Sequence, residues 1–265
     1  MQAEDCRSLR VLTVLEQLSH TQYAQTLAQL AQRTGLPKSS LLRILQSLEQ
    51  AAYVMRVPGD GGYMPGPRAH HLAAGLLGSP HFLRASRHVL GRLVGIIGES
   101  CNLTALAGDT VQYLSRVESP EPMRLQLRME IGARVPLHCT ASGKLFLALA
   151  PELQRRQTLD RIALEALTPR SLVDRTRLEE ALDSIRSQRI GIDNEEFVRG
   201  MVAIAVPVYD EQEQLVAALA CHAATAQRSM AELLQFAGPM REAAAEMAAL
   251  FGRSGLEREE ASVRA

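Results

Sequence analysis

The sequence predicts a two-domain protein of the α+β class, and three observations support this prediction. The chain has 265 residues, which is enough for two domains of ordinary size. Up to about residue 66, apolar residues recur at helical spacing and are followed by a strand pair. From residue 81 onwards, helical segments are mixed with hairpins of period two. Helices combined with antiparallel hairpins are typical of the α+β class.

Composition limits the classes of function. The chain is 46% hydrophobic and 22% charged, so it has enough apolar material for a folded core. It carries 29 basic and 29 acidic residues and so lacks the basic surplus common in DNA-binding proteins. No apolar run is long enough to cross a bilayer, and the N-terminus lacks a signal-peptide core. We therefore expect a cytoplasmic protein with no membrane partner.

The cysteines give no sign of a disulfide scaffold, because they are far apart and form no CxxC pair. Two of them stand beside histidines, in His138-Cys139 and Cys221-His222. Adjacent residues of a strand point to opposite faces, so each dipeptide offers one metal ligand at a time. A nucleophilic cysteine would also need an oriented base and an oxyanion site. We predict no catalytic residue, no metal and no cofactor.

The most informative stretch is residues 26–50, TLAQLAQRTGLPKSSLLRILQSLEQ, which reads as two helices joined by a tight turn. Thr26 can cap the first helix, and Gln29 would complete a capping box. Gly35 stands where this helix should end, because glycine adopts the left-handed C′ conformation without steric cost. Pro37 suits the first turn of the second helix, where its missing N–H needs no partner.

The second helix has an apolar face and a polar face. At 100° per residue, Leu41, Ile44, Leu45 and Leu48 fall on one side. Arg and Gln are residue types that pair bidentately with guanine and adenine in the major groove, and both occur on the other side. The alternative is a two-helix hairpin whose polar face is merely solvated. The predicted DNA-contacting set is Lys38, Ser39, Ser40, Leu42, Arg43 and Gln46.

The flanking segments complete a winged helix-turn-helix within residues 1–66. Ser8 can cap an earlier helix with leucines at helical spacing. Residues 52–57 read as a strand, PGDGG as a turn, and Tyr63-Met64 as the start of the returning strand. Between Arg33 and Arg68 the chain has five basic and two acidic residues, so any basic patch is local. We expect weak non-specific affinity for DNA, because phosphate neutralisation sets that affinity.

A Pro-Gly-Pro run at 65–67 interrupts the chain and introduces a linker of residues 67–80, which contains a short amphipathic helix at 68–77. The second domain is expected to span residues 81–252, and residues 253–265 to form a mobile tail. Its predicted helices are at 81–98, 140–149, 174–188 and 229–251, and its predicted strands at 101–107, 110–117, 124–128, 190–192, 202–209 and 215–221.

Three runs resemble the IclR family of bacterial transcription regulators: SLRVLTVLEQL, TLAQLAQRTGLPKSSLLRILQSLEQAAYV and GGYMPGPRAHHLA. The similarity extends from about Ser8 to Phe251. It implies a GAF-like C-terminal domain with a curved antiparallel sheet that binds small effectors. It also implies a homodimer or dimer of dimers on a roughly palindromic operator. Leu42 departs from the polar or aromatic residue of many relatives, so it is suited to contact a thymine methyl group.

The segment PLHCTASGK, residues 136–144, is the first candidate for effector binding. It leads into a helix, whose unpaired N–H groups and positive dipole end suit a carboxylate. Thr140 and Ser142 add hydroxyl groups. The alternative is an ordinary capped helix with Gly143 for close packing. The resemblance places this segment in the effector pocket and implies roles for His138, Thr140, Ala141 and Ser142.

Two further segments, DNEEFVRGMVA and ALACHAAT, match effector-binding stretches of the family. The match implies a role for Asp193, and Ala203 stands where relatives often have cysteine. Ala220 and His222 replace two serines that hold a small acid in some relatives. A protonated His222 could bind an anion and Ala220 enlarges the space, so we expect an acid of more than three carbons. Alternatively, His222 is a satisfied polar strand residue, and Glu195 and Glu196 are solvated.

The predicted function is a bacterial transcription regulator, not an enzyme, whose binding to double-stranded operator DNA is modulated by a small organic acid effector. Two alternatives stay open. An enzyme tethered to DNA by the first domain would turn over a metabolite. A ligand-free dimerising regulator would give no hit in a thermal-shift screen of organic acids.

Overall fold

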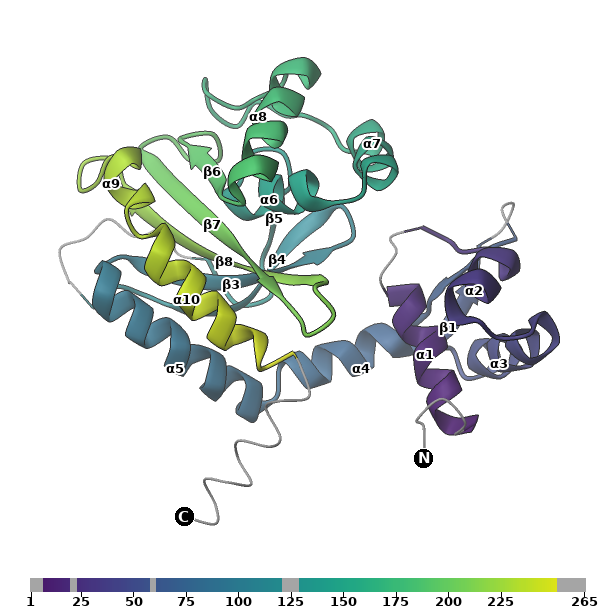
Figure 1. Ribbon diagram of the computed structural model, residues 1–265. Helices are drawn as coiled ribbons and strands as arrows, with labels where there is room; N and C mark the ends of the chain where they lie inside the picture. The colour runs from purple at the N-terminus through teal and green to yellow at the C-terminus, as the bar shows by residue number, and fades with distance from the viewer. Residues whose placement is uncertain (1–6, 20–22, 58–60, 121–128, 252–265) are drawn as a thin grey trace, which may run out of the picture. The chain divides into compact units, whose positions relative to one another are not determined.

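The computed structural model describes residues 7–19, 23–57, 61–120 and 129–251 (Figure 1). The chain divides into two compact units, Met1–Ser79 and Pro80–Ala265, each of which is described by itself. The predicted α+β class is confirmed. The elements of the first unit are α1 (Arg7–Ser19), α2 (Leu27–Thr34), α3 (Lys38–Gln50), β1 (Val54–Arg56), β2 (Tyr63–Pro65) and α4 (Pro67–Leu77).

The start and end signals of α2 are confirmed. The Thr26 hydroxyl accepts a hydrogen bond from the backbone N–H of Gln29, and the Gln29 side chain accepts one from the N–H of Thr26. Gly35 ends the helix with a φ of 67°, in the left-handed region where glycine is unstrained. Pro37 is the residue before the first turn of α3, one position earlier than expected.

The hairpin of the first unit is shorter than predicted. Val54 pairs with Pro65 and Arg56 with Tyr63 in an antiparallel ladder. Ala52 was expected to begin the strand, but its φ of 59° is left-handed and incompatible with extended backbone. The turn at 58–60 lies outside the described residues.

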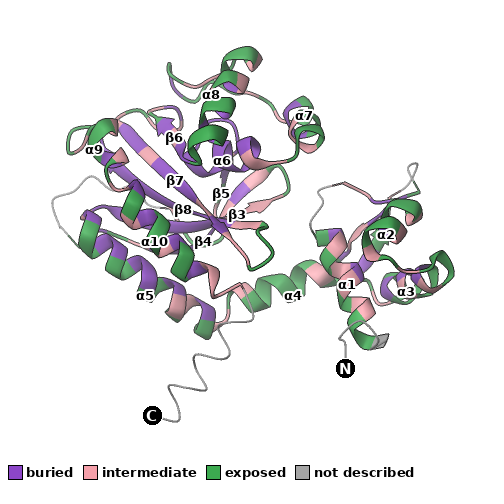
Figure 2. Cartoon of the chain, in the orientation of Figure 1, coloured by how far each residue is buried: buried purple, intermediate pink, exposed green. Residues whose placement is uncertain are grey.

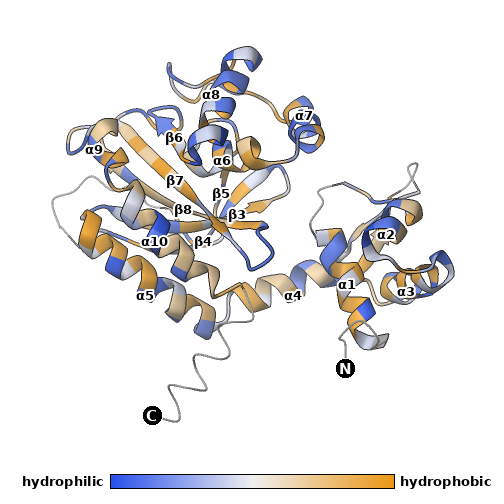
Figure 3. Cartoon of the chain, in the orientation of Figure 1, coloured by the Kyte–Doolittle hydropathy of each residue, from blue (hydrophilic) through white to orange (hydrophobic). Residues whose placement is uncertain are grey.

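The second unit is built on one six-stranded antiparallel sheet with the order β5-β4-β3-β8-β7-β6. Apolar residues dominate β7, and β7 and β8 are buried over most of their length (Figures 2 and 3). Helices α5 and α10 cover one face of the sheet, while α6 lies on the other with α8 packed outside it (Figure 1). The elements are α5 (Pro80–Ile97), β3 (Ser100–Ala107), β4 (Thr110–Val117), β5 (Arg134–Pro136), α6 (Ala141–Leu149), α7 (Glu152–Arg161), α8 (Arg175–Gln188), β6 (Gly191–Asn194), β7 (Met201–Tyr209), β8 (Leu215–Ala224), α9 (Met230–Leu234) and α10 (Ala237–Ala248).

Three features of this unit differ from the sequence prediction. The expected helix at 229–251 is two helices, because the N–H groups of Gln235 and Phe236 bond to carbonyls three residues back, and α10 starts after Phe236. Helix α7 was not predicted, since its sequence ELQRRQTLDR has almost no apolar stripe. Strand β5 is only three residues long and gave no periodic signal. The predicted strand at 124–128 and the tail at 253–265 lie outside the described residues.

Candidate DNA-reading helix and effector cavity

Helix α3 has one buried side and one exposed side. Leu41, Leu45 and Leu48 are buried against α1, α2 and the hairpin. The six residues predicted to contact DNA lie away from this core: Ser40 is half-buried and the other five are exposed. Leu42 is 36% exposed and presents an apolar surface among polar neighbours. Truncating any exposed member of the set therefore leaves the core of the unit in place.

Two arginines add positive charge to the hairpin and to the start of α4. The Arg56 guanidinium lies 5.3 Å from the centre of the Tyr63 ring, and that of Arg68 lies 5.1 Å from the Tyr53 ring. Cation–π contacts of this kind hold the guanidinium groups in place while leaving their N–H donors available. This is the local basic character that the sequence predicted for the first unit.

In the second unit, a cavity lies between the sheet and the N-terminal end of α6, lined by small and polar side chains together with larger apolar ones that include Val135, Phe197 and Met201. The space open to the centre of a water-sized sphere is about 40 Å³. All the residues predicted to bind effector line this cavity except His138. The lining residues from the predicted set are Thr140, Ala141, Ser142, Asp193, Ala203, Ala220 and His222.

Strand register explains why these distant residues meet. Directly paired residues of an antiparallel ladder share a face of the sheet. Asp193 pairs with Ala203, and Ala203 pairs with His222, so these three form a row across β6, β7 and β8. Ala220 pairs with Asn102 in the neighbouring row, and Asn102 also lines the cavity. The sequence did not single out Asn102, because strand pairing cannot be read from one chain.

His138 lies apart from the cavity, contrary to expectation. Its side chain is buried, and its Nε2 atom lies 2.9 Å from the carbonyl oxygen of Glu165. This contact explains the residue as a satisfied polar group inside the fold. We therefore remove His138 from the proposed effector-binding set.

Helix α6 begins directly over the sheet. A Cβ atom on Gly191 would lie 2.1 Å from the carbonyl oxygen of Ala141, so only glycine permits this approach. The Thr140 hydroxyl was expected to donate to a ligand, but it donates to the Pro136 carbonyl at 2.7 Å and accepts from the N–H of Gly143. The hydroxyl of Thr140 is thus used in capping the helix. Ser142 also lines the cavity and is not the capping residue.

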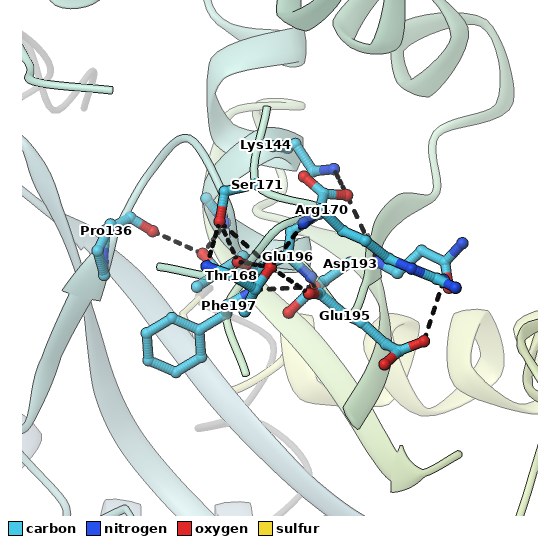
Figure 4. A network of polar contacts seen from close by, with 12 residues as sticks. Pro136, Lys144, Thr168, Arg170, Ser171, Asp193, Glu195, Glu196 and Phe197 are labelled. Carbon is cyan, nitrogen blue, oxygen red and sulfur yellow. Dashed lines mark hydrogen bonds and ion pairs between the residues drawn. The ribbon is translucent and has the colours of Figure 1, made fainter. Parts of the chain in front are cut away.

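Asp193 belongs to a buried cluster of charges with Glu196 and Lys144 (Figure 4). Lys144 forms an ion pair with Glu196, whose Oε2 atom has no hydrogen-bond partner among the described residues. Burial and the nearby Glu196 carboxylate raise the pKa of Asp193 to about 7, although the N–H of Glu196 donates to it at 2.7 Å. Glu196 was left open as a solvated residue, and this is wrong.

Residues 168–171 bond to the segment that carries Asp193 and Glu196. The Thr168 hydroxyl donates to the carbonyl of Glu195 at 2.6 Å, and the Ser171 hydroxyl donates to that of Glu196 at 2.6 Å (Figure 4). Arg170 forms an ion pair with Glu195 at 3.0 Å. These bonds give one wall of the cavity a fixed shape.

His222 is neutral, so the anion-binding role that depended on its protonation does not apply. Burial and the positive charge of Arg116 lower the pKa of His222 to about 3. The Nη2 atom of Arg116 lies 3.4 Å from Nε2 of His222. The charged group beside His222 is the Arg116 guanidinium, whose side chain is 5% exposed. Nothing in the sequence distinguished Arg116 from the other arginines.

Two findings bear on other kinds of site. Within residues 7–19, 23–57, 61–120 and 129–251, no three His, Cys, Asp or Glu side chains are grouped as a metal site would require. Over the same residues, no helix is long and apolar enough to span a bilayer. Cys101, Cys139 and Cys221 are buried free thiols.

Three helices with a β-hairpin, a polar face on the third helix and a second unit with a lined cavity define a class: transcription regulators with a ligand-binding domain. Two matches to family models identify the family within this class. The IclR helix-turn-helix domain matches residues 9–58, and the C-terminal domain of bacterial transcriptional regulator IclR matches residues 75–249. The chain belongs to the IclR family of transcription regulators.

Similar proteins support this assignment. The probable transcriptional regulator SauR of Cupriavidus necator is 38% identical over 244 residues, which cover 92% of this chain and 96% of that protein. The transcriptional repressor IclR of Escherichia coli is 28% identical over 245 residues, which cover 92% of this chain and 89% of that protein. Both relatives are named as regulators of transcription.

Solved structures agree on the fold. An IclR transcriptional regulator from Alicyclobacillus acidocaldarius has a TM-score of 0.59 and 27% identity, covering 92% of this chain and 98% of that chain. The inducer-binding domain of the Acinetobacter transcription factor PobR, a double mutant in complex with 3-hydroxybenzoic acid, has a TM-score of 0.58 and 26% identity. The match covers 63% of this chain and 97% of the PobR domain.

Proposed function

We propose that the chain binds double-stranded operator DNA as a dimer or dimer of dimers through α3, and that a small organic acid in the cavity sets its affinity for DNA. One observation carries the proposal: the chain combines an exposed polar helix face in one unit with a lined cavity in the other. The proposed domains are residues 1–66 for DNA, a linker at 67–80 and residues 81–252 for the effector. The division between compact units after Ser79 supports this boundary.

The DNA half of the proposal depends on the exposed face of α3. Arg43 and Gln46 are proposed to contact base edges, where Arg pairs with guanine and Gln with adenine. Leu42 is suited to contact a thymine methyl group. Lys38, Ser39 and Ser40 lie at the start of the helix and are proposed to bind phosphates. Two copies held together would read two half-sites spaced by about one helical turn of DNA.

The effector half depends on the cavity. The open space measures about 40 Å³, less than the roughly 150 Å³ of a cavity that binds benzene, so the walls must move apart to admit an acid of several carbons. Ala203 and Ala220 leave this space open, which favours an acid of more than three carbons. The 3-hydroxybenzoic acid held by the PobR domain is an acid of that size. The effector must bind two arrangements of the protein with different affinity, since binding alone shifts no equilibrium.

The first test is selection of DNA from a random-sequence library with the full chain, followed by fluorescence anisotropy on the enriched duplex. We expect an enriched palindrome, and an acid from a graded carboxylic series that changes the Kd by about fivefold or more. A fragment of residues 1–79 should fold but bind more weakly, because it lacks the association that gives avidity.

Each result separates one part of the proposal. Failure to enrich any sequence would remove the DNA-binding assignment. An enriched duplex whose Kd no acid changes would remove the effector assignment. A fragment that binds as tightly as the full chain would exclude a role for the second unit in DNA affinity. Light scattering on the full chain distinguishes a dimer from a dimer of dimers.

A further inference from the structure

We propose that the second unit also contacts DNA, through Arg84 and Arg87 of α5, whose guanidinium groups bind backbone phosphates. The inference rests on the proposed operator binding and adds a contact outside the helix-turn-helix. It names an interaction surface on the ligand-binding unit, with the DNA backbone as the partner.

Positive charge is concentrated in one stretch of a chain that is neutral as a whole. The chain balances 29 basic residues with 29 acidic ones. Between Gly61 and Gly98, however, it has four arginines and not one aspartate or glutamate. Arg84 and Arg87 are two of these four arginines. A concentration of one sign of charge is typical of a surface that meets a polyanion.

Helix α5 buries one side and exposes the other (Figure 2). Leu90 and Leu93 are among its buried residues. Arg84, Arg87 and His88 are exposed. Helical residues three apart are neighbours on the surface, with Cβ atoms about 5–6 Å apart. The guanidinium groups of Arg84 and Arg87 therefore lie close together in solvent, where they repel each other unless an anion binds to them.

The two arginines differ from most arginines of the second unit, which form ion pairs. Arg92 on the same helix pairs with Glu246, for example. Neither Arg84 nor Arg87 forms an ion pair with any residue in the described part of the chain. Their N–H donors are therefore available to an anion from outside the chain, and the guanidinium fork matches the geometry of phosphate.

The chain connects this surface directly to the DNA-reading unit. Helix α4 belongs to the first unit and ends at Leu77, and α5 begins at Pro80. Only Gly78 and Ser79 separate the two helices. A duplex held by α3 is therefore tethered to the second unit, and tethering raises the effective concentration at which a further contact forms. Contacts too weak to hold DNA by themselves then add to the affinity.

DNA supplies the density of anions that this surface fits. A duplex carries one phosphate charge for about every 1.7 Å of its axis. Arginine binds phosphate with two parallel hydrogen bonds, and each phosphate that it neutralises releases condensed counterions. Phosphate contacts carry no sequence information. Arg84 and Arg87 should therefore strengthen binding to operator and random DNA alike, and make both more sensitive to salt.

The test is the salt dependence of DNA binding by the full chain. Fluorescence anisotropy gives the Kd of the wild type and of Arg84→Ser/Arg87→Ser on the selected operator and on a random duplex, at a series of salt concentrations. The double variant should bind both duplexes more weakly, by the same factor. Its slope of log Kd against log salt should be smaller by roughly 1.8, because each lost phosphate contact removes about 0.9 from the slope.

A second double variant controls for the loss of positive charge as such. Arg134→Ser/Arg177→Ser removes two exposed arginines of the same unit, from β5 and α8. It should keep the Kd and the salt slope of the wild type on both duplexes. Circular dichroism and light scattering establish that both double variants are folded and assembled like the wild type.

Photo-crosslinking separates a direct contact from a long-range electrostatic effect. His88→Cys places a thiol beside the two arginines and leaves both of them in the chain. The substitution is combined with Cys6→Ser, because the three described cysteines are buried. With an aryl azide attached, position 88 should crosslink to bound DNA, whereas the same label on Arg177→Cys should not.

The opposing outcomes are distinct. An unchanged salt slope in Arg84→Ser/Arg87→Ser, or weaker binding without a crosslink from position 88, would overturn the contact. Weaker binding to the operator alone would also overturn it, because a phosphate contact acts on both duplexes. Dissociation of the variant into smaller assemblies would show that the two arginines hold copies of the chain together instead. In each of these cases a wild type that binds its operator leaves the proposed function standing, whereas a wild type that binds no duplex removes both.

Discussion

The Nη2 atom of Arg116 lies 3.4 Å from Nε2 of His222, which lines the cavity proposed to bind an effector. A guanidinium can only donate hydrogen bonds, so Nε2 of the histidine is the acceptor and the ring proton is on Nδ1. A proton on Nε2 would face the positive charge of Arg116. Together with burial, this is why the pKa of His222 falls to about 3.

The depressed pKa of His222 predicts a pH dependence of stability. Between about pH 3 and 6.5 the unfolded chain binds a proton at this histidine and the folded chain does not. The free energy of unfolding therefore falls as the pH is lowered below 6.5. His222→Gln removes this contribution. The free energy of unfolding of the variant, relative to that of the wild type, should therefore increase by about 1.4 kcal/mol for each pH unit below 6.5.

Thermal unfolding at pH 7, 6 and 5 measures this change. His88→Gln, which alters an exposed histidine of α5, controls for the loss of a histidine as such. The difference in Tm between His222→Gln and the wild type should move in favour of the variant as the pH falls. A constant difference across this range would show that His222 is not held neutral.

The raised pKa of Asp193 predicts that its contribution to the free energy of unfolding changes with pH in the opposite direction. Its pKa is raised from 3.8 to about 7, chiefly by burial and also by the Glu196 carboxylate, while Lys144 and two backbone N–H groups act against the shift. Between about pH 4 and 7 the folded chain holds a proton that the unfolded chain has lost, so this group destabilises the fold as the pH rises. Asp193→Asn should remove that loss and become more stable relative to the wild type by about 1.4 kcal/mol per pH unit between 4 and 7.

Chemical denaturation of Asp193→Asn and wild type at pH 5 and 7.5 gives the measurement. Asn keeps an oxygen that can accept from the N–H groups of Glu196 and Phe197, so the loop geometry is conserved. A smaller advantage of the variant at pH 7.5 than at pH 5 would contradict the raised pKa. Because Asp193 and His222 oppose each other between about pH 4 and 6.5, the wild type should show little slope from this site.

The buried pair Lys144–Glu196 should be costly to break from one side. Both side chains are under 10% exposed, so Lys144→Met leaves a buried carboxylate without its cation. Removing one member of such a pair costs about 3–5 kcal/mol. The double variant Lys144→Met/Glu196→Gln should recover most of the loss, because no unpaired charge remains. The measurement is urea unfolding of the two single variants and the double variant; strictly additive losses would show that the two residues do not interact.

Local signals explain what the sequence could predict. The capping box of Thr26 with Gln29 and the left-handed Gly35 act within one turn, and the helix pair was predicted correctly from them. The leucine stripe of α3 likewise depends only on helical spacing. Residues far apart in the chain had to be brought together by the family resemblance, since the row of Asp193, Ala203 and His222 exists only through strand pairing.

Buried charged residues show most clearly what could not be predicted from the sequence. Lys144 follows SG and precedes LFLALA, and all of residues 141–148 are buried, so the apolar flank was a usable sign that this lysine is inside. Arg116 had no comparable sign, because Ser115 and Arg116 alternate like any strand pair with one solvated side. For the same reason the sequence left the charge state of His222 open. The charge state of a histidine depends on its neighbours across strands, and Arg116 is 106 residues away.

The exposed face of α3 gives the last prediction. Arg43→Ala and Gln46→Ala should each lower affinity for the selected operator by about 1–3 kcal/mol and leave binding to random DNA nearly unchanged, because base contacts carry sequence information and phosphate contacts do not. Both side chains are exposed and lie away from the buried Leu41, Leu45 and Leu48, so the thermal stability of the first unit should not change. Gln50→Ala, an exposed residue of the same helix outside the predicted set, is the matched control. Anisotropy titrations on operator and random duplexes at two salt concentrations decide the matter. Equal weakening on both duplexes, with a reduced salt slope, would make Arg43 a phosphate contact, and unchanged operator affinity in both variants would remove α3 as the reading helix.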